Sequence, residues 1–165
     1  MRFKMLLIFA LFFCACHKED LERYTLDPGE FTENVLQEQN FQMSLIGRLK
    51  QNPSTSTLLA LVKTREIFAQ KYLEDLVNLK LSDQQPHLYT LSESHSKSLM
   101  TIDLLAGLDY EKALIEMLVN SDQNMLAFHI RASSNSGLAN PQLRSWTETK
   151  LPQLRNNLKE SQNLK

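Results

Sequence analysis

Apolar residues recur at the three- and four-residue spacing of amphipathic helices along most of this chain, and the alternating pattern typical of strands is absent. The first predicted helix runs from about Pro28 to Lys50, because Asp27 can cap it and Pro28 suits its first position. The second follows the breakers at residues 51–54 and runs to about Leu81. The short connection predicts an antiparallel pair.

Two further helices are expected after a polar connection over residues 82–91. Ser92 can cap a short helix that runs to about Ala106, with Gly107 at its C-terminal end. Asp109 can then cap a third long helix, Tyr110 to about Ala132.

The last predicted helix opens at Asn140-Pro141, in the usual order of cap and then proline, and Pro152 is expected to kink it. Together these elements predict an all-α domain. We expect a four-helix, ferritin-like bundle of up-down pairs, joined by a crossover that carries the short extra helix.

Polar residues interrupt the apolar stripes of these helices at a few positions. An isolated buried charge is very unfavourable, so Arg65 needs a partner if it lies inside. We expect it to pair with Glu38 or Gln42 on the first helix; alternatively, its guanidinium extends to water along the edge of the stripe. A structural role is favoured over a catalytic one. The predicted buried polar cluster comprises Glu38, Gln42, Arg65, Ser121 and Asn157.

The first sixteen residues have the organisation of a secretory signal. Arg2 and Lys4 precede an uncharged apolar run, Met5 to Ala15, which is followed abruptly by charged residues. The run is too short for a transmembrane helix, which needs about 20 residues. The alternative is a buried N-terminal helix or strand of a cytosolic protein.

The end of this leader resembles a bacterial lipobox, in which a small residue precedes the cysteine that receives lipid. Ala15 precedes Cys16, whereas bulky Phe13 precedes Cys14, so Cys16 is the predicted lipidation site. A C-x-C metal or redox site is disfavoured, since no second ligand pair completes it. The expected organisation is a signal peptide over 1–15, a lipidated cysteine and tether over 16–26, and a helical domain over 27–165.

The charged residues 18–20 resemble a short signal that sends some lipoproteins to the cell surface; the alternative is a solvated tether. The mature chain would keep 150 of the 165 residues, enough for one domain with its own core. The full chain has a formal net charge of −1 and only four glycines. No basic cluster indicates nucleic-acid binding, and no glycine-rich loop indicates a phosphate site.

The histidines do not match a di-metal carboxylate site. Such a site in a helical bundle needs Glu-x-x-His on two helices, and none of His17, His87, His95 and His129 lies three residues after a glutamate. His129 is expected to be a partly buried packing residue. No serine has the strand-turn-helix context of a nucleophile. We therefore predict no catalytic residue, no metal and no cofactor.

Four segments resemble a bacterial family of helical envelope proteins, domain-of-unknown-function family 4142. They are Phe31–Val35, Leu61–Glu66, Leu108–Tyr110 and Lys150–Leu158, the last with a Leu-Pro-x-Leu run. The resemblance covers about residues 31–164 and implies a ferritin-like fold and an envelope location. The family commonly carries histidines where this chain has Arg65, Ser121 and Asn157, so any role of those histidines is not transferred.

The sequence thus predicts an exported protein anchored by Cys16, in the outer membrane and facing the periplasm or the cell surface. The expected role is a non-catalytic module that binds an envelope protein partner or supports the envelope. The alternative is a divergent ferritin-like metal-binding protein or enzyme, and a weaker one is a carrier of a small hydrophobic ligand.

Overall fold

The computed structural model describes residues 25–51, 53–79 and 91–164, and these residues form five helices and no strand. The chain is therefore all-α over this range. The predicted signal peptide, both cysteines and His87 lie outside the described residues. The helices are α1 (Pro28–Gln51), α2 (Ser56–Asn78), α3 (Glu93–Ile102), α4 (Gly107–Ser133) and α5 (Pro141–Gln162).

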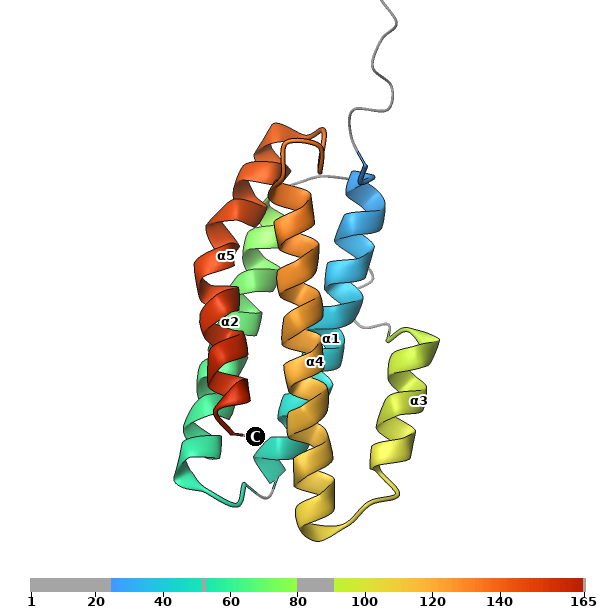
Figure 1. Ribbon diagram of the computed structural model, residues 1–165, viewed down its shortest axis with the longest axis vertical. Helices are drawn as coiled ribbons and strands as arrows, with labels where there is room; N and C mark the ends of the chain where they lie inside the picture. The colour runs from blue at the N-terminus through green and yellow to red at the C-terminus, as the bar shows by residue number, and fades with distance from the viewer. Residues whose placement is uncertain (1–24, 52, 80–90, 165) are drawn as a thin grey trace, which may run out of the picture.

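Four long helices pack side by side around a common core (Figure 1). The contacts form a closed ring, in which α1 touches α2 and α4, and α5 touches α4 and α2. α1 and α5 run in one direction along the molecule, and α2 and α4 run in the other (Figure 1). The shorter α3 lies outside this ring and packs against α4. No helix in the described part of the chain is long and apolar enough to cross a membrane.

Several predicted helix starts are confirmed by their side-chain caps. The carboxylate of Asp27 accepts a hydrogen bond from the backbone of Glu30 at 2.9 Å, and the side chain of Asn140 accepts one from Leu143 at 2.9 Å. Ser92 caps α3 in the same way. These contacts satisfy backbone N–H groups that have no partner within the helix.

The boundary between α3 and α4 differs from the prediction. α3 ends at Ile102, and Gly107 begins α4 with a φ of 61°, a conformation that glycine adopts without strain. Ala106 occupies the cap position, and Asp109 lies within the first turn, where a negative charge is favourable. Local turn bonds from residues 103–105 close α3 instead of the expected glycine.

One other helix end also differs from expectation. α2 ends at Asn78, a few residues before the predicted Leu81, and Leu79 is its C-cap. α5 runs from Pro141 to Gln162 with Pro152 inside it, as the sequence predicted, and the kink at Pro152 stays a prediction. Leu151 and Leu158 of this helix are half-buried.

The apolar core is divided into two parts along the long axis. The part at the end where α1 begins includes Phe31, Val35, Tyr72, Met125, Leu143 and Trp146. The part at the other end includes Phe41, Leu45, Ile46, Leu58, Leu99 and Leu118. The predicted polar cluster lies at the level where these two parts meet.

The segment before α1 is fixed to the connection between α4 and α5. Backbone N–H groups of Thr25 and Leu26 donate to Ser136 and Gly137 at 2.8 and 3.1 Å, and Arg131 donates to the Thr25 carbonyl at 2.9 Å. Leu26 is buried and forms an isolated bridge with Leu138. The ordered packing thus includes Thr25 and Leu26, which the sequence had placed in the tether.

Candidate functional site

All five polar residues singled out from the sequence are buried. Each residue is at most 4% exposed, and together they come from all four long helices. Burial of so much polar surface is unfavourable unless each group has a partner, so the partners decide what the cluster can do. The structure arranges these residues in two groups.

The first group is built around Asp122 of α4. The Arg65 guanidinium donates from Nη1 to Oδ1 at 3.0 Å and from Nη2 to Oδ2 at 2.8 Å, with both side chains 1% exposed. This is a bidentate ion pair, the strongest arrangement that arginine and a carboxylate make. The predicted pairing of Arg65 with Glu38 or Gln42 is therefore wrong; its ionic partner is Asp122.

Two more side chains complete the shell of Asp122. Gln42 of α1 donates its amide hydrogen to Oδ1 at 3.1 Å, and Ser161 of α5 donates its hydroxyl to Oδ2 at 2.6 Å. The carboxylate thus links α1, α2, α4 and α5. Each of its oxygens accepts two hydrogen bonds, so its lone pairs are in use.

Asn157 of α5 joins this group mainly through its backbone. The Arg65 Nη2 group donates to the Asn157 carbonyl oxygen. With the side-chain amide turned so that its oxygen faces the guanidinium, Oδ1 also accepts from Nη1 at 2.8 Å. The Arg65 guanidinium is therefore hydrogen-bonded to α5 as well as to α4.

Asp122 and Ser161 were not recognised in the sequence. Asp122 lies four residues after Leu118 and three before Met125, so it falls on the same inner stripe of α4. Ser161 lies four residues after Asn157 on the inner side of α5. Helical spacing alone could have found both, but it could not have shown that they share a partner.

The second group surrounds Glu38 of α1, on the side of α3. Ser121 donates to Oε1, and Asn124 donates to Oε2 at 3.4 Å. The His95 Nε2 atom of α3 lies 3.6 Å from Oε2, and its ring stacks on Phe41 with centroids 4.2 Å apart. Glu38 and Ser121 therefore face α3 instead of Arg65.

Burial has opposite effects on the acids and the base of these groups. It raises the pKa of Glu38, and the hydrogen bonds from Ser121 and Asn124 partly oppose this. Burial also raises the pKa of Asp122, against the charge of Arg65 and the bonds from Ser161 and Gln42. It lowers the pKa of His95. Each shift disfavours the charged form inside the protein.

His129 belongs to the apolar core and to neither of the two polar groups. Its Nδ1 lies 2.8 Å from the Met125 carbonyl, which can only accept, so Nδ1 carries the proton and Nε2 accepts from the Tyr72 hydroxyl at 3.0 Å. Burial lowers the pKa of His129 to about 4 and raises that of Tyr72 well above its usual value. An imidazole that is neutral, makes two hydrogen bonds and lies among aromatic rings is a packing group. It is completely buried, more so than the sequence predicted.

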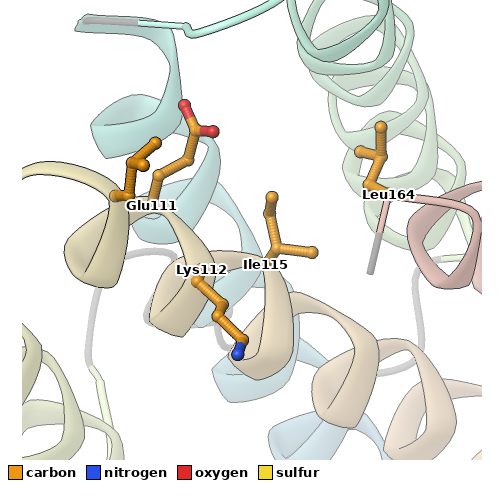
Figure 2. Close-up of a pocket in the computed structure, with 5 residues that line it drawn as sticks. Glu111, Lys112, Ile115 and Leu164 are labelled. Atoms are coloured by element: carbon orange, nitrogen blue, oxygen red, sulfur yellow. The ribbon is translucent and has the colours of Figure 1, made fainter.

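A pocket lies away from both polar groups, near the start of α4. It has a volume of about 240 Å³ and is lined by Leu108, Glu111, Lys112, Ile115 and Leu164 (Figure 2). The Glu111 carboxylate accepts a hydrogen bond from the backbone N–H of Ser54 at 2.9 Å. Among the described residues, no three histidine, cysteine or acidic side chains come close enough to hold a metal ion.

Comparison with known proteins adds nothing to this picture. No family model matches the chain, and no curated protein or solved structure matches it significantly.

Proposed function

We propose that this protein is an exported lipoprotein, anchored through Cys16, whose helical domain is a non-catalytic binding or structural module of the cell envelope. We place it in the outer membrane, facing the periplasm or the cell surface, with an envelope protein as partner. The leader, with two basic residues, an apolar run and a terminal Ala15-Cys16, supports the export and anchoring.

The non-catalytic part of the proposal rests on one observation. The buried ionic centre, Asp122 with Arg65, is saturated by hydrogen bonds from three other helices. Catalytic acids and bases need access to a substrate and a lone pair or proton to exchange. Asp122 has neither, and its contacts are those of a group that holds helices together.

We also propose that the four long helices form a four-helix bundle of the ferritin-like type. The ring of contacts and the placement of α3 before α4 support this arrangement. Membership of family 4142 stays a prediction from the four sequence segments given above. The proposal does not depend on this membership, because the chain has Arg65, Ser121 and Asn157 where the family commonly carries histidines.

Replacement of the candidate lipidation cysteine tests the anchoring. In a Gram-negative host given radiolabelled palmitate, we expect the full chain to incorporate label and to sediment with the outer membrane. Cys16→Ser should abolish the label, since no other residue of the lipobox can form the thioether. Cys14→Ser is the matched control and should keep both properties. Two stable acyl chains are enough to hold a protein at a bilayer.

The opposite result would be equally clear. Labelling of Cys16→Ser to the level of the unchanged chain, or a cytosolic location of the unchanged chain, would contradict the proposal.

A further inference from the structure

A group of large apolar side chains is exposed around the turn between α3 and α4. Leu104 is 85% exposed and Leu108 is 79% exposed, and Met100 and Leu105 are exposed beside them. We call these four residues the turn patch. The turn lies at the end of the molecule opposite the start of α1 (Figure 1). Monomeric proteins rarely expose apolar patches of more than a few hundred Å², and such patches mark interaction sites.

The pocket described above adjoins the turn patch, because Leu108 belongs to both. Its other apolar lining comes from Ile115 and Leu164 (Figure 2). A dry cavity of about 150 Å³ can hold benzene, so this pocket has room for a leucine side chain. One surface therefore carries both projecting leucines and a recess with room for one leucine side chain, as two-fold pairing of identical copies requires.

The charges near the turn patch distinguish between partners. Residues 97–116 contain two lysines but four acidic side chains, an excess that would repel an anionic lipid surface. Asp109 and Lys112 are both exposed, and in the described part of the chain neither forms an ion pair. In a two-fold contact, Lys112 of each copy can meet Asp109 of the other.

We propose that the turn patch is the interface between two copies of this chain. One leucine of the turn enters the pocket of the second copy, and the Asp109–Lys112 contacts form twice at the rim. The four side chains expose on the order of 500 Å² per copy, so pairing would bury at most on the order of 1,000 Å² of them, close to the lower limit of specific interfaces. The dimer is accordingly weak and reversible.

Photo-crosslinking of the full chain in cells tests the pairing directly. With a photoreactive benzoyl-phenylalanine in place of Leu104, we expect a covalent product of twice the chain mass, and mass spectrometry should identify two copies of this chain. The same probe at Ile67, which is 68% exposed on α2, is the matched control and should give no dimer. Products of the Leu104 probe with lipid or with another protein alone would overturn the proposal.

Three variants separate a specific interface from general stickiness. Leu108→Asp should reduce the dimer about tenfold or more, because it buries a charge at the interface. It should leave the fold intact, since an exposed acidic residue in the first turn of a helix is favourable. Lys112→Asp should weaken the dimer, and the double swap Asp109→Lys with Lys112→Asp should restore it. Unchanged dimer in Leu108→Asp, or no restoration in the double swap, would contradict the proposed geometry.

Discussion

At the scale of single residues, the Arg65–Asp122 pair dominates the interior. Two fully buried charges are stable there only because every oxygen of the carboxylate and both terminal nitrogens of the guanidinium have partners. Such a pair need not add net stability over a well-packed apolar core. Removal of one partner is costly, however, because the charge of the other partner is then buried without a counter-ion.

The cost of breaking this pair can be measured. We expect Arg65→Met to lower the free energy of unfolding by about 3–5 kcal/mol, since Asp122 would keep a buried charge without its counter-ion. The double variant with Asp122→Leu should recover much of this loss. Denaturant unfolding monitored by circular dichroism gives the values.

The exposed pair Lys50–Glu66 is the matched control for that experiment. It joins α1 to α2 with the charged atoms 2.7 Å apart but in contact with water. Lys50→Met should therefore change the stability by no more than about 1 kcal/mol. Equal losses for Arg65→Met and Lys50→Met would contradict the buried-pair interpretation.

At the scale of the elements, the connection between α4 and α5 holds the segment before α1 and turns the chain from α4 into α5. Gly137 lies so close to the end of α4 that an added Cβ would be 2.2 Å from the Arg131 carbonyl oxygen and 2.5 Å from that of Ala132. The same residue accepts the Leu26 N–H. Glycine is required there by close approach of the backbone, and one residue thereby positions three segments.

Two glycine-to-alanine substitutions should have opposite effects. Gly137→Ala should destabilise the protein by roughly 1–3 kcal/mol, because the methyl group meets backbone atoms that cannot move separately from α4. Gly47→Ala, about one turn before the end of α1 and with open space around it, should stabilise by about 0.5–1 kcal/mol. Thermal unfolding of both variants checks the signs, and a neutral Gly137→Ala would show that the connection can adjust.

At the scale of the whole molecule, the polar groups around Asp122 and Glu38 lie between the two parts of the apolar core, and α3 lies on the side of Glu38. The titrating groups of this interior act on stability in opposite directions. His129 is neutral in the fold, and burial lowers its pKa to about 4, so its protonation favours the unfolded chain. The raised pKa values of Glu38 and Asp122 act the other way, because the folded protein binds their protons more readily.

The contribution of His129 can be isolated by substitution. Because its pKa is about 6.5 in the unfolded chain, its contribution is complete above that pH and is lost as the pH falls towards 4. The loss is on the order of 3 kcal/mol. We expect the stability of His129→Gln to lack this part of the pH dependence.

Tyr72→Phe is the control for the pH experiment. It removes the hydrogen bond to His129 without removing the titrating group, so the pH dependence should remain while the overall stability falls. Parallel pH profiles for the unchanged protein and His129→Gln would show that His129 does not titrate in this way.

The chain's local patterns determined much of this architecture. Helical periodicity and the Asp27, Ser92 and Asn140 caps predicted the all-α class and most helix starts, because these signals act within one or two turns. Periodicity also indicated which polar residues point inward, since a helix repeats its inner face at fixed spacing. The boundary at Gly107 was misread because a glycine can end one helix or begin the next, and only the path of the chain distinguishes them.

The pairing of the buried residues was decided only by the tertiary structure. Arg65 lies 57 positions from Asp122, and the choice between Asp122 and Glu38 depends on how α2 and α4 are rotated and shifted against each other. Those offsets follow from the packing of all four long helices at once, which no local pattern records. The sequence by itself therefore determined the elements and their inner faces, and three-dimensional packing decided which charges meet.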